Sequence, residues 1–246
     1  MRKLLQWPLS LIFIIQMYVA MAVVAVVWAP WALFSRDGAY SACKSYSRWV
    51  FFTLRILCGM RCEVRGTPPV GEVLVAAKHQ SFLDIMMIFE AVPRGKFIMK
   101  RELIYSPFLG QYAWRLGCVF VNRGKRGQAI AKMKADVAAG AAHPGQLIIY
   151  SQGTRVAPGV KATYKVGSGL LYDQLGQPCV PVATNVGVLW PKRGILRKPG
   201  VAVVEFLPAI APGLAVGDFM ARLEAEVEGA SNRLMAEAGF RARSGG

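Results

Sequence analysis

The stretch "EVLVAAKHQSFLDIMMIFE", residues 72–90, places a β-type run directly before a helical one. Residues 72–78 read as a short strand, and Ser81 is a favourable N-cap for a helix that starts at Phe82. A strand, a short turn and a helix in this order form the repeating unit of α/β proteins. The stretch therefore indicates the α/β class.

The same alternation continues along the chain. Further β-type runs cover residues 61–66, 96–100, 118–122, 146–151, 179–184 and 201–207, and helical stretches cover residues 82–91, 127–140, 164–175 and 217–238. Strands that alternate with helices form parallel or mixed sheets. We expect an α/β fold with a mixed, largely parallel sheet flanked by helices.

The N-terminal region is strongly apolar. From Leu4 to Ser35 the chain has no charged residue, and about 20 apolar residues are enough to cross a bilayer. Pro30 can break this helix, and residues 40–60 read as a second, amphipathic segment. We expect a membrane-embedded helical pair in residues 1–60 that enters one leaflet and returns, followed by a catalytic domain over residues 61–246.

Two other interpretations of the apolar run are less favourable. A signal peptide would also begin with basic residues, but the run continues well past the candidate cleavage site. A single buried core helix would be unusually long. Basic residues prefer the cytoplasmic side, so we expect the domain at the cytoplasmic face of a membrane, the inner membrane if the cell is bacterial.

The charge is strongly positive, with 30 Lys and Arg against 14 Asp and Glu, a net charge of +16. This balance favours an anionic partner. Basic residues follow several expected strands, as in Lys78, Lys100, Arg123 and Arg155, and ligands of α/β sheets bind at the carboxyl ends of strands. Nucleic-acid binding is disfavoured because the charges are dispersed and no nucleic-acid motif is present.

His79 and Asp84 are the candidate catalytic pair. On one continuous helix their side chains would point about 140° apart. If the helix instead begins after Ser81, Asp84 completes a capping box and His79 folds back to reach its carboxylate. That arrangement suits a general base, although the pair alone fits a purely structural cap slightly better. One His and one Asp are too few for a metal site.

Two later stretches can hold a phosphate. "FVNRGKRG", residues 120–127, places Arg123 after a strand, and "IYSQGTRVAPG", residues 149–159, places Gly153, Thr154 and Arg155 after another. A guanidinium group and exposed backbone amides at a strand end form a good phosphate cradle.

Taken in order, these stretches resemble the motifs of the glycerolipid acyltransferase family, the 1-acyl-sn-glycerol-3-phosphate acyltransferases and related lysophospholipid acyltransferases. "KHQSFLD" (78–84) is similar to N-H-x-S-x-x-D, "VFVNRG" (119–124) to the second motif, "YSQGTR" (150–155) to F-P-E-G-T-R, and "CVPVATN" (179–185) to the apolar fourth motif. Lys78 stands where asparagine is frequent, Ser151 where proline is usual and Gln152 where glutamate is usual.

The resemblance implies transfer of a fatty acyl chain from acyl-CoA or acyl-carrier protein to the free hydroxyl of a lysolipid. The expected acceptor is 1-acylglycerol 3-phosphate, which gives phosphatidic acid in phospholipid biosynthesis. By this resemblance His79 deprotonates the hydroxyl, Asp84 orients His79, and no metal or bound cofactor is needed. The acceptor would be bound by Lys100, Arg123, Gln152, Gly153, Thr154 and Arg155.

Gln152 leaves two acceptor lipids possible. A neutral amide keeps the shape and hydrogen-bonding reach of glutamate but not its charge, so it can still hold the glycerol part of the acceptor. If the usual glutamate balances the arginines, this site is more positive and favours another lysolipid, such as lyso-ornithine lipid. A non-enzymatic alternative is a basic membrane-associated binding protein without catalysis. The intact His79–Asp84 pair argues against it.

Overall fold

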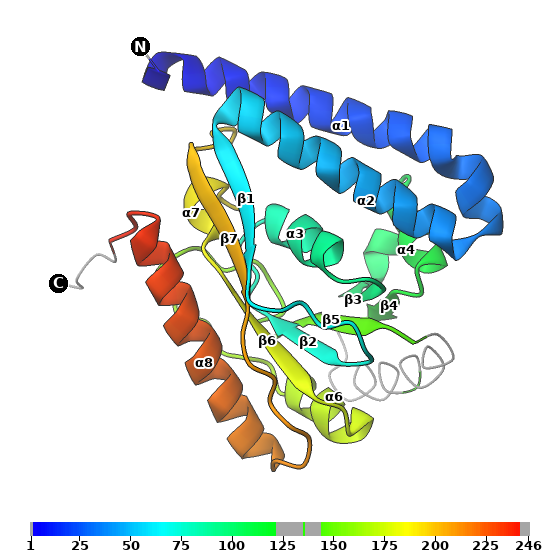
Figure 1. The fold of residues 1–246 in the computed structure, drawn as a ribbon, viewed down its shortest axis with the longest axis vertical. Coiled ribbons are helices and arrows are strands. Elements are labelled where there is room, and N and C mark those ends of the chain that lie inside the picture. The colour runs from blue at the N-terminus through cyan, green and yellow to red at the C-terminus, as the bar shows by residue number, and fades with distance from the viewer. Residues whose placement is uncertain (1, 122–134, 136–143, 242–246) are drawn as a thin grey trace.

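The computed structural model describes residues 2–121, 135 and 144–241, which form one sheet with helices on both of its faces (Figure 1). The strands are β1 Met60–Arg65, β2 Leu74–Ala77, β3 Gly95–Lys100, β4 Val119–Val121, β5 Gln146–Tyr150, β6 Cys179–Thr184 and β7 Gly200–Phe206. All seven coincide with the β-type runs in the sequence, so the predicted α/β class is confirmed.

The strand order is β1-β7-β6-β2-β5-β3-β4. Neighbouring strands are parallel throughout except for β6 and β7, which are antiparallel. The sheet is therefore mixed and largely parallel, as predicted. One consequence matters for the site: β2, β3, β4, β5 and β6 all end at the same edge, so the residues that follow them are neighbours.

The helices divide between the two faces of the sheet. They are α1 Arg2–Phe34, α2 Arg36–Thr53, α3 Leu83–Ala91, α4 Leu109–Arg115, α6 Gly167–Leu175, α7 Val186–Leu189 and α8 Val216–Glu237, with a π-helix at Leu54–Cys58 and a 3-10 helix at Arg101–Tyr105. Helices α1, α2, α3 and α7 contribute to the core on one face, and α6 and α8 contribute to the core on the other; the α1–α3 layer and α8 lie on opposite sides of the sheet in Figure 1. The expected helix over residues 127–140 and the candidate Arg123 lie outside the described residues.

Central strand β2 shows why both faces are covered. Its residues are all buried, with Val75 and Ala77 in the core beneath α1–α3, and Leu74 and Ala76 in the core beneath α6 and α8. Successive side chains of a strand point to opposite faces. A strand that is apolar at every position therefore requires a helical layer on each side.

The expected helical pair is present, but Pro30 does not separate its members. Helix α1 continues through Pro30 to Phe34, and the chain reverses at Ser35, whose extended backbone and side chain cap α2. Proline removes one helical hydrogen bond, here the one to the Val26 carbonyl, and side chains of α4 contact other carbonyls of this part of α1. Tyr112 Oη donates to Ala25 O at 2.8 Å, and Arg115 Nε donates to Ala32 O at 3.1 Å.

Helix α1 has one packed stripe and one open face. Phe13 and Met17 are buried, and the Gln6 amide donates to the carbonyls of Cys58 and Arg197 at 3.1 and 2.6 Å. Within the described residues, Leu5–Phe34 is the one helix with the length and apolarity to cross a membrane, with a mean hydropathy of 2.5. Only 22% of its most apolar window is buried, so it is not an ordinary core helix.

Substitutions on the two faces of α1 should separate packing from membrane contact. Phe13 has no exposed surface and meets Trp190 edge to face at 5.5 Å, so Phe13→Ala should lower the free energy of unfolding by about 3–5 kcal/mol. Ile12, which is 52% exposed, is the control, and Ile12→Ala should change it by less than about 0.5 kcal/mol. Thermal unfolding in detergent measures both, and equal losses would contradict the packed stripe.

Candidate active site

His79 and Asp84 meet at the carboxyl end of β2. His79 Nδ1 lies 2.8 Å from Asp84 Oδ1, the imidazole is 13% exposed, and the carboxylate has no exposed surface. With the Nδ1 proton directed at Asp84, Nε2 is the basic nitrogen of the ring. The predicted approach of the two side chains is therefore present, in a geometry that suits proton transfer at Nε2.

The turn between β2 and α3 produces this approach. Asp84 Oδ2 accepts hydrogen bonds from the backbone N–H groups of Gln80 and Ser81 at 2.8 and 2.7 Å, and Ser81 Oγ accepts one from Leu83 N at 3.3 Å. The bond from Ser81 N to Asp84 is one half of the predicted capping box, but Ser81 Oγ accepts from Leu83 N and not from Asp84 N. The helix begins at Leu83, one residue later than predicted, and His79 precedes it and turns back over its first turn.

The Tyr150 ring, at the end of β5, stacks on the imidazole of His79. The two rings are stacked with centroids 3.9 Å apart and an interplanar angle of 18°. Burial, and then the nearby Asp84 carboxylate, raise the pKa of the Tyr150 phenol, so the ring beneath His79 stays neutral. Tyr150 was not among the predicted site residues. Its place follows from the parallel pairing of β2 with β5, which puts Tyr150 beside Ala77 at the strand ends.

The loop after β5 is tied directly to His79. Gly153 has φ of +70°, a conformation that glycine adopts without steric cost, and its N–H donates to Tyr150 O at 2.8 Å. Three residues later, Val156 N–H donates to His79 O, also at 2.8 Å. Arg155, which is half-buried, is thus adjacent to a residue in main-chain contact with His79. No side-chain partner for its guanidinium occurs among the described residues.

The remaining candidates are placed less closely. Thr154 is exposed on the same loop, and Lys100 is exposed at the end of β3, two strands away from β2. Arg123 follows β4 but lies outside the described residues, so its predicted contact stays a prediction. Among the described residues, no three His, Cys, Asp or Glu side chains converge as a metal site would require.

Lys78 and Gln152 turn away from this group, toward α8. Lys78 is 2% exposed and its ammonium donates to Glu228 Oε1. Gln152 is 3% exposed, and its amide donates to the same oxygen at 3.4 Å. Lys78 is therefore not an open positive charge at the substrate edge, and Glu228 places a carboxylate beside Gln152. The predicted contact of Gln152 with the acceptor stays a prediction.

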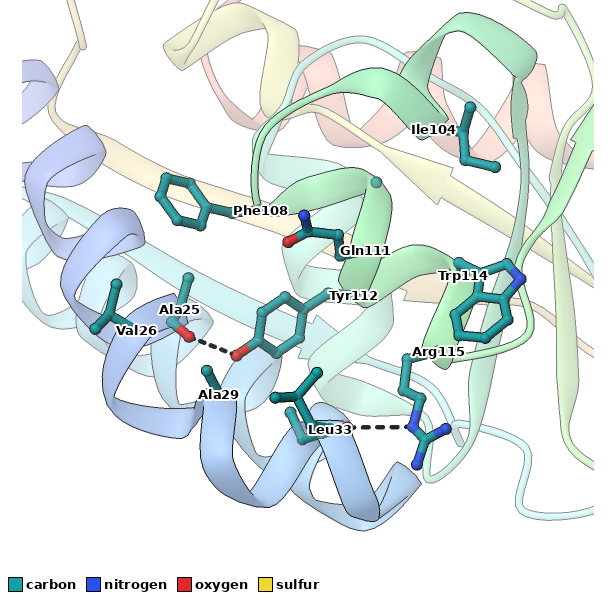
Figure 2. A pocket seen from close by; sticks show the side chains of 12 residues that line it. Ala25, Val26, Ala29, Leu33, Ile104, Phe108, Gln111, Tyr112, Trp114 and Arg115 are labelled. Carbon is teal, nitrogen blue, oxygen red and sulfur yellow. Dashed lines mark hydrogen bonds between the residues drawn. The ribbon is translucent and has the colours of Figure 1, made fainter.

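An apolar cavity of about 590 Å³ opens between the second half of α1 and α4 (Figure 2). Its lining includes Ala29, Leu33 and Trp114, with Tyr112 and Arg115 at the side of α1. A smaller cavity of about 80 Å³ shares Ala25, Phe108 and Tyr112 with it and reaches Phe82, the residue before α3. The two cavities share this wall, and the smaller one lies on the side toward the turn that holds His79.

Comparison with known proteins gives a consistent result. Residues 61–185 match the family model described as acyltransferase. The chain is 27% identical over 169 residues to the 1-acyl-sn-glycerol-3-phosphate acyltransferase of Pseudomonas aeruginosa, covering 68% of this chain and 66% of that protein. It is 29% identical over 170 residues to the alpha enzyme of Mus musculus, covering 67% and 60%.

The fold has a solved counterpart. The crystal structure of the 1-acyl-sn-glycerophosphate (LPA) acyltransferase PlsC from Thermotoga maritima superposes with a TM-score of 0.78 at 21% identity, over 96% of this chain and 100% of that one. The curated relatives are longer than the matched region, since the alignments span 66% of the Pseudomonas protein and 60% of the mouse protein.

Replacing Asp84 should test the buried hydrogen bonds independently of chemistry. Asp84→Ala leaves two buried N–H groups without their acceptor, which should lower the free energy of unfolding by roughly 2–5 kcal/mol. Asp218 is a matched control, since it is also an acid in the first turn of a helix but is exposed; Asp218→Ala should cost below about 1 kcal/mol. Urea unfolding in detergent measures both, and similar losses would show that Asp84 contributes no more than a helix-dipole effect.

Proposed function

The chain belongs to the acyltransferase family, and we propose that it transfers a fatty acyl chain from acyl-CoA or acyl-carrier protein to the free hydroxyl of 1-acylglycerol 3-phosphate. The product would be phosphatidic acid. The observation that carries the proposal is the His79–Asp84 pair, with the loop of Arg155 hydrogen-bonded to the His79 backbone. The named relatives, which are 1-acyl-sn-glycerol-3-phosphate acyltransferases, support the same acceptor.

The proposed reaction needs one proton acceptor and no covalent intermediate. His79 Nε2 takes the proton of the acceptor hydroxyl as its oxygen attacks the thioester carbonyl. A C–O bond forms, the C–S bond breaks, and the leaving thiolate receives a proton from the imidazolium. Asp84 holds Nδ1 and stabilises the transient positive charge, and the neutral Tyr150 ring fixes the plane of the imidazole.

The head group of the acceptor is assigned to the loop after β5. Arg155 can form a forked pair with a phosphate, and its position next to the Val156–His79 hydrogen bond sets the spacing between phosphate and base. Gly153 and Thr154 complete this loop, and Lys100 lies at the end of β3 at the same edge. Arg123, which follows β4 in the sequence, is proposed as a further ligand of the phosphate. The relatives named above are 1-acyl-sn-glycerol-3-phosphate acyltransferases, which favours that acceptor over lyso-ornithine lipid.

The two apolar cavities suit a fatty chain. The larger cavity lies against α1, whose exposed face is apolar, and the smaller one leads to Phe82 beside the catalytic turn. An acyl chain could thus lie between α1 and α4 with its carbonyl near His79. Three polar side chains line this wall, Gln111, Tyr112 and Arg115, and two of them, Tyr112 and Arg115, donate to α1 carbonyls (Figure 2). The rest of the wall is apolar and suits an apolar occupant.

We assign residues 1–60 to membrane binding and residues 61–246 to catalysis. The membrane association rests on the open apolar face of α1. The excess of basic residues supports the cytoplasmic face, because positive charge is retained on that side. Lipid would then reach the site from the leaflet in which α1 and α2 lie.

The proposal is tested by supplying the purified protein in membranes with a labelled acyl donor and a panel of lysolipids that includes lysophosphatidic acid and lyso-ornithine lipid. Lysophosphatidic acid should be acylated fastest, with acyl-CoA and acyl-carrier protein compared as donors. His79→Ala should lower turnover about 10²–10⁴-fold while the protein remains folded and membrane-bound. Near-normal turnover of this variant would contradict the mechanism, and absence of any transfer by the unmodified protein would favour a non-catalytic binding protein.

Arg155→Lys should raise the KM for the acceptor more than the KM for the acyl donor, because lysine cannot reproduce the guanidinium fork. Arg123→Lys should act in the same direction. Arg222→Lys is the control, since Arg222 is an exposed residue of α8 paired with Glu226, and it should leave both KM values unchanged. If both site variants disturb only the donor KM, these arginines bind the phosphates of the donor instead.

A further inference from the structure

One oxygen atom of α8 connects the two strand ends that carry the site. Glu228 Oε1 accepts hydrogen bonds from Lys78 Nζ, from Tyr164 Oη at 3.0 Å and from Gln152 Nε2 at 3.4 Å. Lys78 directly precedes His79, and Gln152 directly precedes Gly153. Three donors from distant parts of the chain thus meet at a single carboxylate.

This carboxylate lies on the far side of the sheet from the base. Successive side chains along an extended chain point to opposite faces, so His79 faces α3 while Lys78 faces α8. The substrate-facing residues therefore occupy one side of these strand ends, and Glu228 holds the same strand ends from the other.

We propose that Glu228 is a positioning residue, which clamps the ends of β2 and β5 and thereby sets the spacing between the base His79 and the phosphate-binding Arg155. The proposal rests on the function proposed above. Glu228 lies beyond the 61–185 span of the family match, and no catalytic or binding role has been assigned to it so far.

The charge of Glu228 is required as well as its shape. Lys78 is almost completely buried, and a buried ammonium group needs a counter-charge nearby. Burial, and then the Glu228 carboxylate, raise the pKa of the Tyr164 phenol, so that group remains a proton donor to the same oxygen. A neutral amide at 228 would keep the hydrogen-bonding shape but leave the ammonium unbalanced.

Gln152 fits this arrangement because it is neutral. A glutamate at position 152 would put a second carboxylate within hydrogen-bonding distance of the first, with a single ammonium to balance both. The cluster therefore contains one carboxylate, placed on α8. This predicts that the carboxylate can be moved between positions 152 and 228 but neither doubled nor removed.

The test is a carboxylate exchange, using lysophosphatidic acid and acyl-CoA as the two substrates. Glu228→Gln and Gln152→Glu should each lower kcat/KM for the acceptor about 10- to 100-fold, the effect expected from misplacing reacting groups, with a smaller change in the KM for the donor. The double variant Glu228→Gln/Gln152→Glu should recover to within about threefold of the unmodified protein, since coupled sites depart from additivity.

Glu226→Gln is the matched control. Glu226 lies two residues before Glu228 on the same helix, and the variant removes its exposed ion pair with Arg222. The kinetics of this variant should be unchanged. Thermal unfolding of each variant is recorded in parallel. Glu228→Gln with unchanged acceptor kinetics would overturn the proposal. A double variant whose kcat/KM is as low as that of the worse single variant would also overturn it. The same holds if the single variants lose thermal stability while their KM values for acceptor and donor equal those of the unmodified protein. Failure of the proposed function is distinct, because the unmodified protein itself would then show no transfer.

Discussion

The Asp84 carboxylate has no exposed surface, so each of its hydrogen bonds must come from the protein. It obtains them from two backbone N–H groups, those of Gln80 and Ser81, and from the His79 ring. A buried carboxylate without such donors is very costly. The turn after β2 must therefore close tightly around Asp84, and closing it starts α3 and turns His79 back toward the helix.

The rest of the site is arranged around that turn. Strand β5 runs parallel to β2 and places the Tyr150 ring under the imidazole. The loop that leaves β5 bends at Gly153 and returns to the His79 carbonyl through Val156. The parallel sheet brings the base and the phosphate-binding loop to one edge, and a few main-chain hydrogen bonds then fix their distance.

Local patterns sufficed to predict all seven strands and the His79–Asp84 approach, because each depends on residues within a few positions of one another. The continuation of α1 through Pro30 could not be predicted, because it depends on distant parts of the chain. Tyr112 and Arg115 of α4 donate to the carbonyls of Ala25 and Ala32, which lie before and after Pro30. The Glu228 contacts could not be predicted, since their partners are 64 to 150 residues away in the sequence. Only the fold brings them together.

The packed stripe of α1 also has a consequence for the order of events during synthesis. Gln6 donates to the Arg197 carbonyl, 191 positions later, and Phe13 packs against Trp190. These contacts can form only after residues 190–197 have been made, whereas the contacts between α1 and α2, such as Gln16 with Trp49 and Thr53, can form much earlier. The end of α1 that carries Gln6 and Phe13 therefore joins the domain late in folding, after the segment around Trp190 and Arg197 is in place.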